Sequence, residues 1–476
     1  MEFLEKLDSY REEMINALTE SVRFRSVPGK PCAGPDGAVY PFGEGVEQAY
    51  QHMLALGASM GFETADYDHY GGHIEWRAPE GSEVFGIAAH LDVVPEGTGW
   101  SMDPYGEIVE DGWIYGRGTT DDKGPVVETL YAMKALKESG CVPKKTIRLI
   151  LGLDEETDKA GMQYYIEHAG MPDEGFTPDG EFPLINGEKG ILIFDLAAKL
   201  RRHTTREGLI LSKLTSGEAP NIVPRTAKAV LASQDPAVYD RIREMVRDYA
   251  EETGYKLTAK KAGTSLAVEA TGRSVHGARP EAGLNALSIL LGFLGRLQFA
   301  GEELNEFIAF YNEHIGFWFH GEQIGCELQD EVSGKLIFNA GMAEFNDEVA
   351  SVTLNIRYPV TCTDRDVFAG IEASLDGTRI GILKKEHEAP LYFEPDDPFV
   401  QKLLEAYRKE TGDLYSEPIV IGGGTYAKMF RNMLAFGASF PGAEDRMHQP
   451  EERLHADAMM KAARIFARAL YSLCVE

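Results

Sequence analysis

The sequence belongs to a long, acidic, globular chain. It has 476 residues, 43% of them hydrophobic and 26% charged, and this length exceeds one ordinary core, so we expect two or three domains. The formal net charge of −29 argues against nucleic acid or an anionic membrane as a partner. Five scattered cysteines without a C-x-x-C pair disfavour both a disulfide framework and a cysteine zinc site. The acidic N-terminus is unlike a signal peptide, and no apolar run is long enough to span a membrane, so we expect a reduced, cytoplasmic protein.

The first part of the chain alternates helical and strand patterns. Apolar residues at helical spacing predict helices over 3–21, 46–61 and 125–139. Apolar runs predict buried strands over 84–88 and 146–153, and a hairpin is predicted over 106–115 with its turn at Asp111-Gly112. This alternation is typical of an open α/β sheet, in which sites form beyond the carboxyl ends of the strands.

Ionisable side chains follow both predicted strands. His90 and Asp92 come directly after the first strand, and a carboxylate beside a metal-bound imidazole accepts its second N–H and fixes the tautomer. Glu155 and Glu156 follow the second strand, where buried charge is costly unless it is paired or bound to metal. Because consecutive strand residues point opposite ways, one glutamate can face a metal while its neighbour faces water or substrate.

Two further acids lie in turns of this first part. Asp121 lies between the flexible turn at 116–118 and the helix predicted at 125–139. Asp179 lies in the turn at 176–180. Taken alone, each would be an ordinary cap or turn aspartate.

From residue 190 to about 393 the pattern changes to α+β, with short strands between helices such as 237–254 and 283–297. Asn221 lies in the loop 217–225, His276 in the glycine-rich turn 272–280, and Arg357 on a strand predicted over 351–358. For His276 and Arg357 taken singly, a surface or structural role is the better interpretation.

After residue 396 the α/β pattern returns. A helix is predicted over 399–411, and a strand over 417–421 leads into Gly422-Gly423-Gly424-Thr425, a turn before a helix that could hold an anion on its backbone N–H groups. A last strand is predicted over 435–440, His448 follows it in a polar loop, and a closing helix is predicted over 453–475.

The collected side chains suit metal-assisted hydrolysis. Two imidazoles and three carboxylates, with no thiolate, fit two divalent ions that share a bridging carboxylate. Such a pair can hold a hydroxide and polarise a carbonyl, while a free glutamate takes the proton of that water and hands it to the leaving amine. The predicted reaction is therefore hydrolysis of an amide or peptide bond. His276 could support the tetrahedral oxyanion, and Arg357 could bind a substrate carboxylate.

Together, the motifs resemble those of the M20 metallopeptidases and, within them, the PepV-like (Sapep-like) dipeptidases. The matching segments are HLDVVP (90–95), GRGTTDDKGP (116–125), GLDEET (152–157), GFTPDGEFP (175–183), SVHGARPEAGLNA (274–286), NIRYP (355–359), GGGTYA (422–427) and His448. They span most of the chain in the order found in that family.

The resemblance implies two metal ions per chain. One would be held by His90, Asp121 and Asp179, and the other by Asp121, Glu156 and His448, with Asp121 bridging. Family members are mostly zinc enzymes, and some work with manganese or cobalt.

The resemblance also implies catalytic and substrate-binding roles. Asp92 would orient His90, Glu155 would be the general acid/base, and His276 would be the lid histidine that supports the oxyanion. Contacts to the substrate backbone and carboxylate would come from Asn221, Arg357, Gly423 and Thr425.

The implied fold is an α/β catalytic domain, with a mixed, mostly parallel sheet flanked by helices, formed by residues 1–189 and 396–476. An α+β lid over 190–395 is inserted into it, made of two subunits with antiparallel sheets. This insert is roughly twice the usual lid of dimeric family members, and a doubled lid stands in for the partner subunit, so we expect a monomer.

His448 is assigned as a ligand by its place in the order of the motifs, because the loop around it, GAEDRMHQP, is generic. His455 is the fallback ligand, although we expect it at the start of the last helix.

The leading functional prediction is a dinuclear metallo-dipeptidase acting on short unblocked peptides. An N-acyl amino acid deacylase or desuccinylase of the same family is the alternative among hydrolases. A non-catalytic binding protein with the same fold is disfavoured, because such a protein is expected to lack Glu155 or a metal ligand and none is missing.

Overall fold

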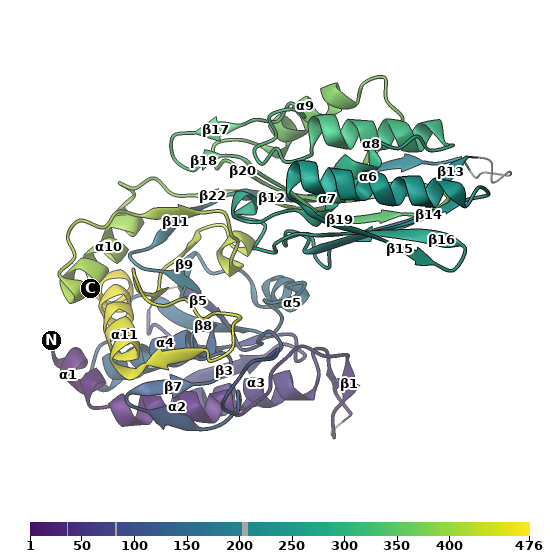
Figure 1. The fold of residues 1–476 in the computed structure, drawn as a ribbon. Helices are drawn as coiled ribbons and strands as arrows, with labels where there is room; N and C mark the ends of the chain where they lie inside the picture. The colour runs from purple at the N-terminus through teal and green to yellow at the C-terminus, as the bar shows by residue number, and fades with distance from the viewer. Residues whose placement is uncertain (36, 81–82, 202–207) are drawn as a thin grey trace. The chain divides into compact units, whose positions relative to one another are not determined.

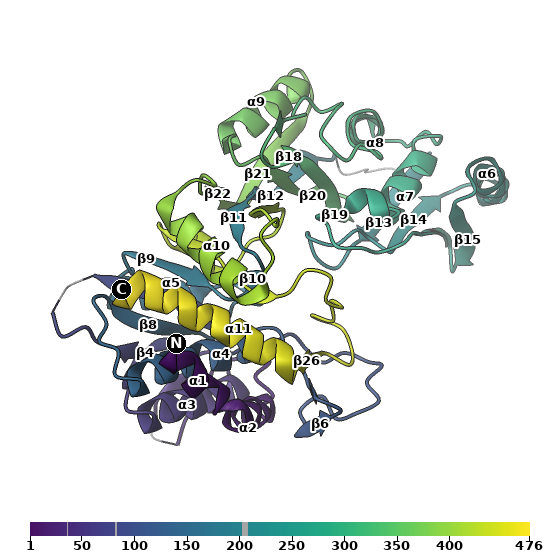
Figure 2. The same ribbon diagram turned by 90° about the vertical axis from the view of Figure 1, so that its left-hand side faces the viewer.

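The chain forms two compact units in the computed structural model, which describes residues 1–35, 37–80, 83–201 and 208–476 (Figure 1 and Figure 2). Unit 1 comprises Met1–Gly187, Leu391–Ile419 and Gly424–Glu476, and unit 2 comprises Glu188–Pro390 and Val420–Gly423. No helix in the described ranges is long and apolar enough to cross a membrane.

Unit 1 is built on a mixed sheet. Its strands lie in the order β22 (Leu391–Tyr392), β11 (Ile185–Glu188), β24 (Met433–Ala435), β9 (Glu174–Thr177), β5 (Val84–His90), β8 (Thr146–Gly152), β4 (Gly72–Trp76) and β3 (Glu63–Asp66), and β23 (Ile419–Ile421) also pairs with β11. The central strands β24, β9, β5 and β8 are parallel, whereas β11, β4 and β3 pair antiparallel to their neighbours. The carboxyl ends of β5, β8 and β9 therefore lie along one edge, where the candidate side chains follow them.

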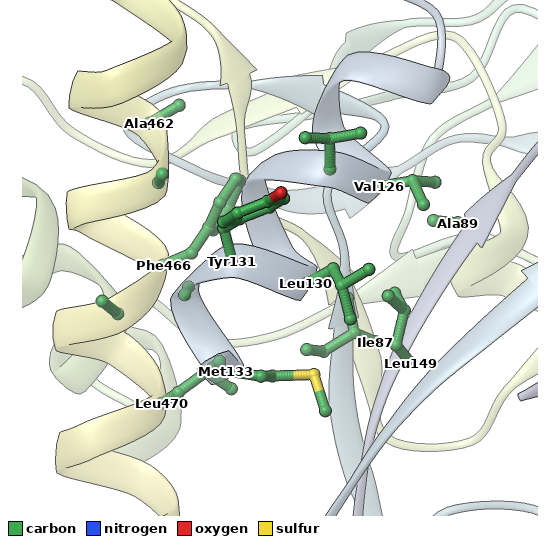
Figure 3. Close-up of a cluster of buried hydrophobic side chains, with 14 of the residues drawn as sticks. Ile87, Ala89, Val126, Leu130, Tyr131, Met133, Leu149, Ala462, Phe466 and Leu470 are labelled. Atoms are coloured by element: carbon green, nitrogen blue, oxygen red, sulfur yellow. The ribbon is translucent and has the colours of Figure 1, made fainter. Parts of the chain in front are cut away.

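Helices cover both faces of this sheet. Helices α4 (Lys123–Glu138) and α11 (Ala456–Leu470) pack together over one face, where Leu130 and Phe466 join Ile87 and Leu149 in the main core of the unit (Figure 3). On the other face, α5 (Ala160–Ala169) and the short 3₁₀ helix η2 (Tyr426–Met429) cover a smaller apolar cluster. The remaining helices of the unit are α1 (Glu2–Asp8), α2 (Arg11–Val22), α3 (Glu44–Ser59), α10 (Pro398–Thr411) and the terminal π-helical turn η3 (Tyr471–Val475).

Short strands complete unit 1, and they confirm one predicted turn. Strands β6 (Ile108–Glu110) and β7 (Trp113–Tyr115) form the predicted hairpin, and Asp111 and Gly112 have φ angles of 49° and 81°, as a type I′ turn requires. The other short pairs are β1 (Cys32–Ala33) with β2 (Val39–Tyr40), and β10 (Gly180–Glu181) with β25 (Ala438–Ser439).

Three sequence-based boundaries were wrong. The first predicted helix is two helices, α1 and α2, separated at residues 9–10. The strand predicted over 435–440 is divided between β24 and β25, because Gly437 has a φ of 79°, outside the extended region. The closing helix begins only at Ala456, since Arg453–His455 forms strand β26 and pairs with β7. His455 is the N-cap of α11, as expected, and its side chain accepts a hydrogen bond from the backbone N–H of Asp457.

Unit 2 is a separate α+β unit on one antiparallel sheet. Its strands lie in the order β15 (Lys256–Ala262), β16 (Ser265–Thr271), β14 (Thr226–Ser233), β13 (Leu209–Ser216), β19 (Ile337–Phe345), β20 (Val349–Tyr358), β12 (Gly190–Lys199) and β21 (Ile380–Glu388). The expected two lid parts thus share one continuous sheet, because β13 pairs directly with β19. The other elements are α6 (Ala237–Thr253), η1 (Pro280–Ala282), α7 (Ala286–Leu294), α8 (Glu302–His314), α9 (Asp364–Leu375), β17 (Gln329–Asp330) and β18 (Gly334–Lys335).

Strand β20 carries apolar side chains on one face of the sheet of unit 2 and polar side chains on the other. Its alternate residues Leu354 and Ile356 lie in the apolar core with the helices. Its intervening residues Asn355 and Arg357 therefore point to the opposite face of the sheet, where they are also buried.

Candidate metal centre

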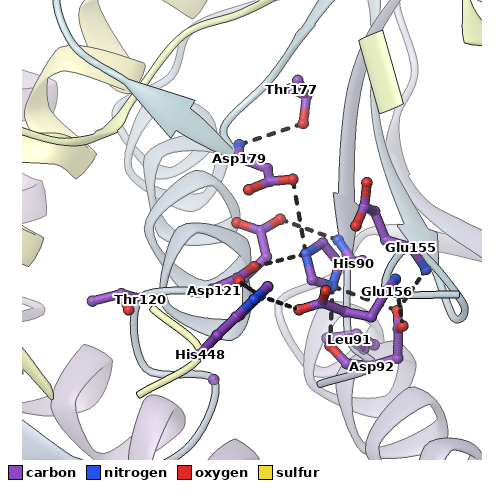
Figure 4. A network of polar contacts seen from close by, with 12 residues as sticks. His90, Leu91, Asp92, Thr120, Asp121, Glu155, Glu156, Thr177, Asp179 and His448 are labelled. Atoms are coloured by element: carbon purple, nitrogen blue, oxygen red, sulfur yellow. Dashed lines mark hydrogen bonds and ion pairs between the residues drawn. The ribbon is translucent and has the colours of Figure 1, made fainter. Parts of the chain in front are cut away.

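His90, the last residue of β5, is buried and held by carboxylates on both ring nitrogens (Figure 4). Its Nδ1 lies 3.0 Å from the backbone carbonyl oxygen of Asp92 and 3.4 Å from Asp92 Oδ1. Its Nε2 lies 3.0 Å from Asp121 Oδ1 and 3.9 Å from Asp179 Oδ2. Because a carbonyl oxygen can only accept, Nδ1 carries the proton of that contact, and Nε2 is the atom directed at the other acids.

Asp121 lies between two histidines. One carboxylate oxygen, Oδ1, is 3.0 Å from His90 Nε2, and the other, Oδ2, is 2.9 Å from His448 Nε2. Each oxygen faces a different imidazole, which is the arrangement that a bridging carboxylate needs.

Asp92 connects His90 to the loop after β8. Its two carboxylate oxygens accept hydrogen bonds from the backbone N–H groups of Glu155, at 3.0 Å, and Glu156, at 3.1 Å. The Glu156 carboxylate then reaches His448, with 2.9 Å between Oε1 and Nε2. The Glu155 carboxylate points elsewhere and forms an ion pair with Lys159, with 2.8 Å between Oε1 and Nζ.

Two overlapping groups of side chains result. His90, Asp121 and Asp179 form one, and Asp121, Glu156 and His448 form the other, with the potential ligand atoms of each group within 4.8 Å of one another. Imidazole and carboxylate donors without thiolate suit zinc, manganese or cobalt, and the shared Asp121 suits a pair of ions. The residues present therefore fit a dinuclear divalent centre, and these groups coincide with the two ligand sets that the resemblance implies.

The ionisation of these groups is tightly linked. Burial and the nearby Asp121 raise the pKa of Asp179 well above its usual range, and burial raises the pKa of Glu156 to about 7. Hydrogen bonds to Asp121 and Glu156 raise the pKa of His448 to about 11, and burial would lower the pKa of His90 but its bonds to Asp121 and Asp92 raise it well above normal. The carboxylates thus concentrate negative charge, so that cations, either protons or metal ions, are needed to balance it.

Two further residues hold the centre, and only the structure identifies them. The buried carboxylate of Glu452 accepts hydrogen bonds from Arg117 Nη1 at 2.5 Å, from Gly118 N at 3.1 Å, and from both N and Oγ1 of Thr120 at 2.9 Å. Asp122 Oδ2 accepts from the backbone N–H of His90 at 3.1 Å. No sequence signal marks Glu452, because its partners lie more than 330 positions away along the chain. Asp122 lies in the motif GRGTTDDKGP beside Asp121, and the sequence assigns it no separate role.

The other predicted site residues are divided between the units. Thr425 belongs to unit 1, where its Oγ1 accepts from the backbone N–H of Ala427 at 3.1 Å and caps η2. The expected helix after the glycine turn is thus a single short 3₁₀ helix. Gly423 belongs to unit 2.

Three more predicted residues lie in unit 2. Asn221 and His276 are exposed, and their segments are joined by a hydrogen bond of 2.7 Å from Gly277 N to Asn221 O. Arg357 is buried; its Nε donates to Asn355 Oδ1 at 3.3 Å and its Nη1 to the carbonyl of Gly422. Burial lowers the pKa of Arg357 to about 10, so this guanidinium stays cationic at neutral pH.

Comparison with known proteins assigns this architecture. Residues 86–472 match the model of "Peptidase family M20/M25/M40". The chain belongs to that peptidase family. The resemblance to the M20 metallopeptidases is therefore confirmed, and two staphylococcal relatives match over nearly the whole chain. A "Putative dipeptidase" of Staphylococcus saprophyticus is 35% identical and one of Staphylococcus epidermidis 36% identical, each with 99% of both chains covered.

Two solved structures agree with the fold of this M20 family member. Human carnosine dipeptidase 1 has a TM-score of 0.56 at 15% identity, covering 98% of this chain and 97% of that one. The M20 family metallo-carboxypeptidase of Sulfolobus solfataricus has a TM-score of 0.55 at 17% identity, covering 96% and 98%. The predicted fold class, a mixed α/β sheet with a separate antiparallel α+β unit, is confirmed.

Proposed function

We propose that this chain is a dinuclear metallo-dipeptidase that hydrolyses short peptides with free termini. The observation that carries the proposal is the pair of ligand groups sharing Asp121, together with a neighbouring carboxylate, Glu155, that belongs to neither group. The names of the staphylococcal relatives support dipeptides as the substrate class.

The first group is His90, Asp121 and Asp179, and the second is Asp121, Glu156 and His448. When bound there, two divalent ions, zinc in the first place and manganese or cobalt as alternatives, would activate a water molecule and polarise the scissile carbonyl.

Proton transfer is assigned to Glu155. Its carboxylate takes a proton from the attacking water as the new carbon–oxygen bond forms, and delivers it to the amine nitrogen as the carbon–nitrogen bond breaks. Asp92 orients its neighbours: its carboxylate lies 3.4 Å from His90 Nδ1 and accepts hydrogen bonds from the backbone N–H groups of Glu155 and Glu156. One buried carboxylate thereby orients a ligand and the proposed base together.

Substrate recognition is assigned to residues outside the two ligand groups, with the segment 190–395 acting as a lid on a catalytic domain of 1–189 and 396–476. His276 would support the oxyanion, and Arg357 would bind the free carboxylate of a dipeptide. Asn221, Gly423 and Thr425 would contact the substrate backbone. We also propose a monomer, because the doubled lid supplies within one chain what a partner subunit supplies in dimeric relatives.

A metal analysis paired with a substrate panel tests the proposal. The purified protein is assayed for bound metal and for cleavage of Ala-Ala, β-Ala-His, N-acetyl and N-succinyl amino acids, before and after chelation. Two ions per chain with chelator-sensitive dipeptide cleavage is the expected result. Cleavage of only the acylated compounds would assign the deacylase reaction instead, and bound metal without any turnover would refute both.

A further inference from the structure

We propose that Asn339 is a positioning residue that holds Asn221 and His276 in one fixed arrangement for the substrate. The inference rests on the proposed function of those two side chains. All three residues lie in unit 2, and nothing in the sequence pattern singles out Asn339.

Asn339 is buried on β19, with 1% of its surface exposed, and its amide nitrogen is directed at the loop that carries Asn221. Nδ2 donates to the carbonyl oxygen of Pro220 at 2.9 Å and to that of Ile222 at 3.3 Å. These carbonyls belong to the residues on either side of Asn221. A single amide group therefore fixes the backbone around an exposed polar side chain.

The same loop is joined to the segment that carries His276. Gly277 N donates to Asn221 O at 2.7 Å, and Val223 N donates to Val275 O at 2.9 Å. An isolated antiparallel bridge pairs Ile222 with His276. Any shift of the Asn221 loop away from β19 is thus transmitted to the backbone of His276.

The Asn221 loop, strand β19 and the His276 turn are closely packed against one another. A Cβ placed on Gly341 of β19 would lie 2.1 Å from the Pro220 carbonyl oxygen. A Cβ placed on Gly277 would lie 2.8 Å from Asn221 O and 3.0 Å from Asn339 Nδ2. The loop therefore rests directly on β19 and on the His276 turn, and small displacements are resisted on both sides.

The orientation of the Asn339 amide indicates that this side chain positions the loop and does more than pack against its neighbours. Among the described residues, its buried Oδ1 has no hydrogen-bond partner, whereas its nitrogen serves two carbonyls. A buried, unpaired acceptor is destabilising, and an aliphatic side chain at this position would avoid that cost. What such a side chain would lack is the donor that holds the loop.

The test compares Asn339→Ala with a matched control, Asn312→Ala, in the full-length, metal-loaded protein. Asn312 is also in unit 2, and its Nδ2 donates to one backbone carbonyl, that of Leu291 at 2.9 Å, far in sequence from the Asn221 loop. Asn339→Asp serves as a near-isosteric second variant, because ionised aspartate has no donor for the two carbonyls.

For the dipeptide that the wild type cleaves, we expect kcat/KM of both Asn339 variants to fall about 10- to 100-fold, mainly through kcat, with metal content unchanged. Asn312→Ala should stay within about twofold of wild type, as for substitutions away from special features. Combined with Asn221→Ala, the Asn339→Ala effect should be smaller than in the wild-type background, because the two residues act through one loop. Wild-type-like kcat/KM for both Asn339 variants, or fully multiplicative effects with Asn221→Ala, would overturn the inference.

Hydrogen exchange of the Gly277 amide tests the positioning role independently of activity. In either Asn339 variant, the Gly277 amide should exchange about tenfold faster or more, because the loop that accepts its hydrogen bond is released, and Asn312→Ala should leave it unchanged. Unchanged exchange at Gly277 in both variants would overturn the positioning role. A wild type that cleaves no dipeptide would refute the proposed function and leave this exchange result standing by itself.

Discussion

Replacing Glu452 with glutamine should destabilise unit 1 and loosen the loop that carries Asp121. Glu452 is fully buried, and three donors share its Oε1 while the Arg117 guanidinium binds Oε2. Arg117 is itself buried, and its guanidinium carbon lies 5.5 Å from the centre of the Trp100 ring. Glutamine keeps the shape of the side chain, but either orientation of its amide places an NH₂ group against a donor.

The magnitude follows from the burial of both charges. A buried ion pair is weak evidence for net stability, but removing one partner leaves the other charge buried and unpaired, which costs about 3–5 kcal/mol. The same change on the surface has little effect. Glu444 pairs with Arg446 and Arg453 at the surface, where solvent screens the charges, so Glu444→Gln should change the free energy of unfolding little.

The assay is urea denaturation of wild type, Glu452→Gln and Glu444→Gln in the presence of chelator, which removes any contribution from bound metal. We expect the unit 1 transition of Glu452→Gln to move to lower urea by an amount equivalent to about 3–5 kcal/mol, and that of Glu444→Gln to move little. Metal titrations of the folded variants should then show weaker binding for Glu452→Gln and not for Glu444→Gln. The reason is that Asp121 directly follows residues 117–120, which are held by their contacts with the Glu452 carboxylate, here called the Glu452 clamp. Equal, small shifts for both variants would refute the reasoning that the Glu452 clamp supports the metal centre.

Three further predictions concern catalysis and pH. Glu155→Gln should bind metal normally and lose at least about 100-fold in kcat, and near-normal turnover would remove Glu155 from proton transfer. Arg357→Ala should raise KM for dipeptides with a free carboxylate and change it little for C-terminally amidated ones, whereas equal effects would argue against carboxylate binding. In chelator, the free energy of unfolding should fall as pH rises from 6 to 9. Burial raises the pKa of Glu156 to about 7, and hydrogen bonds to carboxylates raise the pKa of His448 to about 11. The folded state therefore holds protons that the unfolded state releases in this pH range. Each such proton contributes up to about 1.4 kcal/mol per pH unit. Added divalent metal should reverse the trend, and stability that rises with pH in chelator would contradict the interpretation that protons balance the buried carboxylates when no metal is bound.

Two of the candidate ligands have local signals in the sequence, whereas Asp121, Asp179 and His448 are assigned through the order of the family motifs. His90 and Glu156 each come at the end of a short apolar run that predicts a buried strand. Ionisable residues at the carboxyl ends of parallel strands converge on one edge of a sheet. The order β9-β5-β8 brings those strand ends together as that rule requires. The fold class could be predicted for the same reason, since helical and strand periodicities alternate clearly along unit 1.

The features that sequence could not supply depend on contacts between distant segments. The Glu452 clamp joins two segments more than 330 residues apart, and the pairing of β13 with β19 that makes one sheet of unit 2 joins Leu214 to Phe345. The sequence predicts helix for the three residues of strand β26, because they precede a strongly amphipathic helix, and only the pairing with strand β7 distinguishes them. Such pairings depend on tertiary context, which overrides local propensity.

The placement of Glu155 and Glu156 explains how adjacent residues of the same type can serve different roles. Asp92 binds both backbone N–H groups, so the two residues are fixed as one unit relative to His90. Their side chains then diverge: Glu156 meets His448 within a ligand group, and Glu155 meets the Lys159 ammonium outside it. A ligand must stay bound to metal throughout turnover, whereas a proton carrier must accept and release a proton in each cycle, and one carboxylate could not meet both demands. Asp92 fixes the backbone of both glutamates, and their side chains point to different partners. This arrangement supports Glu155 as the proton carrier and Glu156 as the ligand.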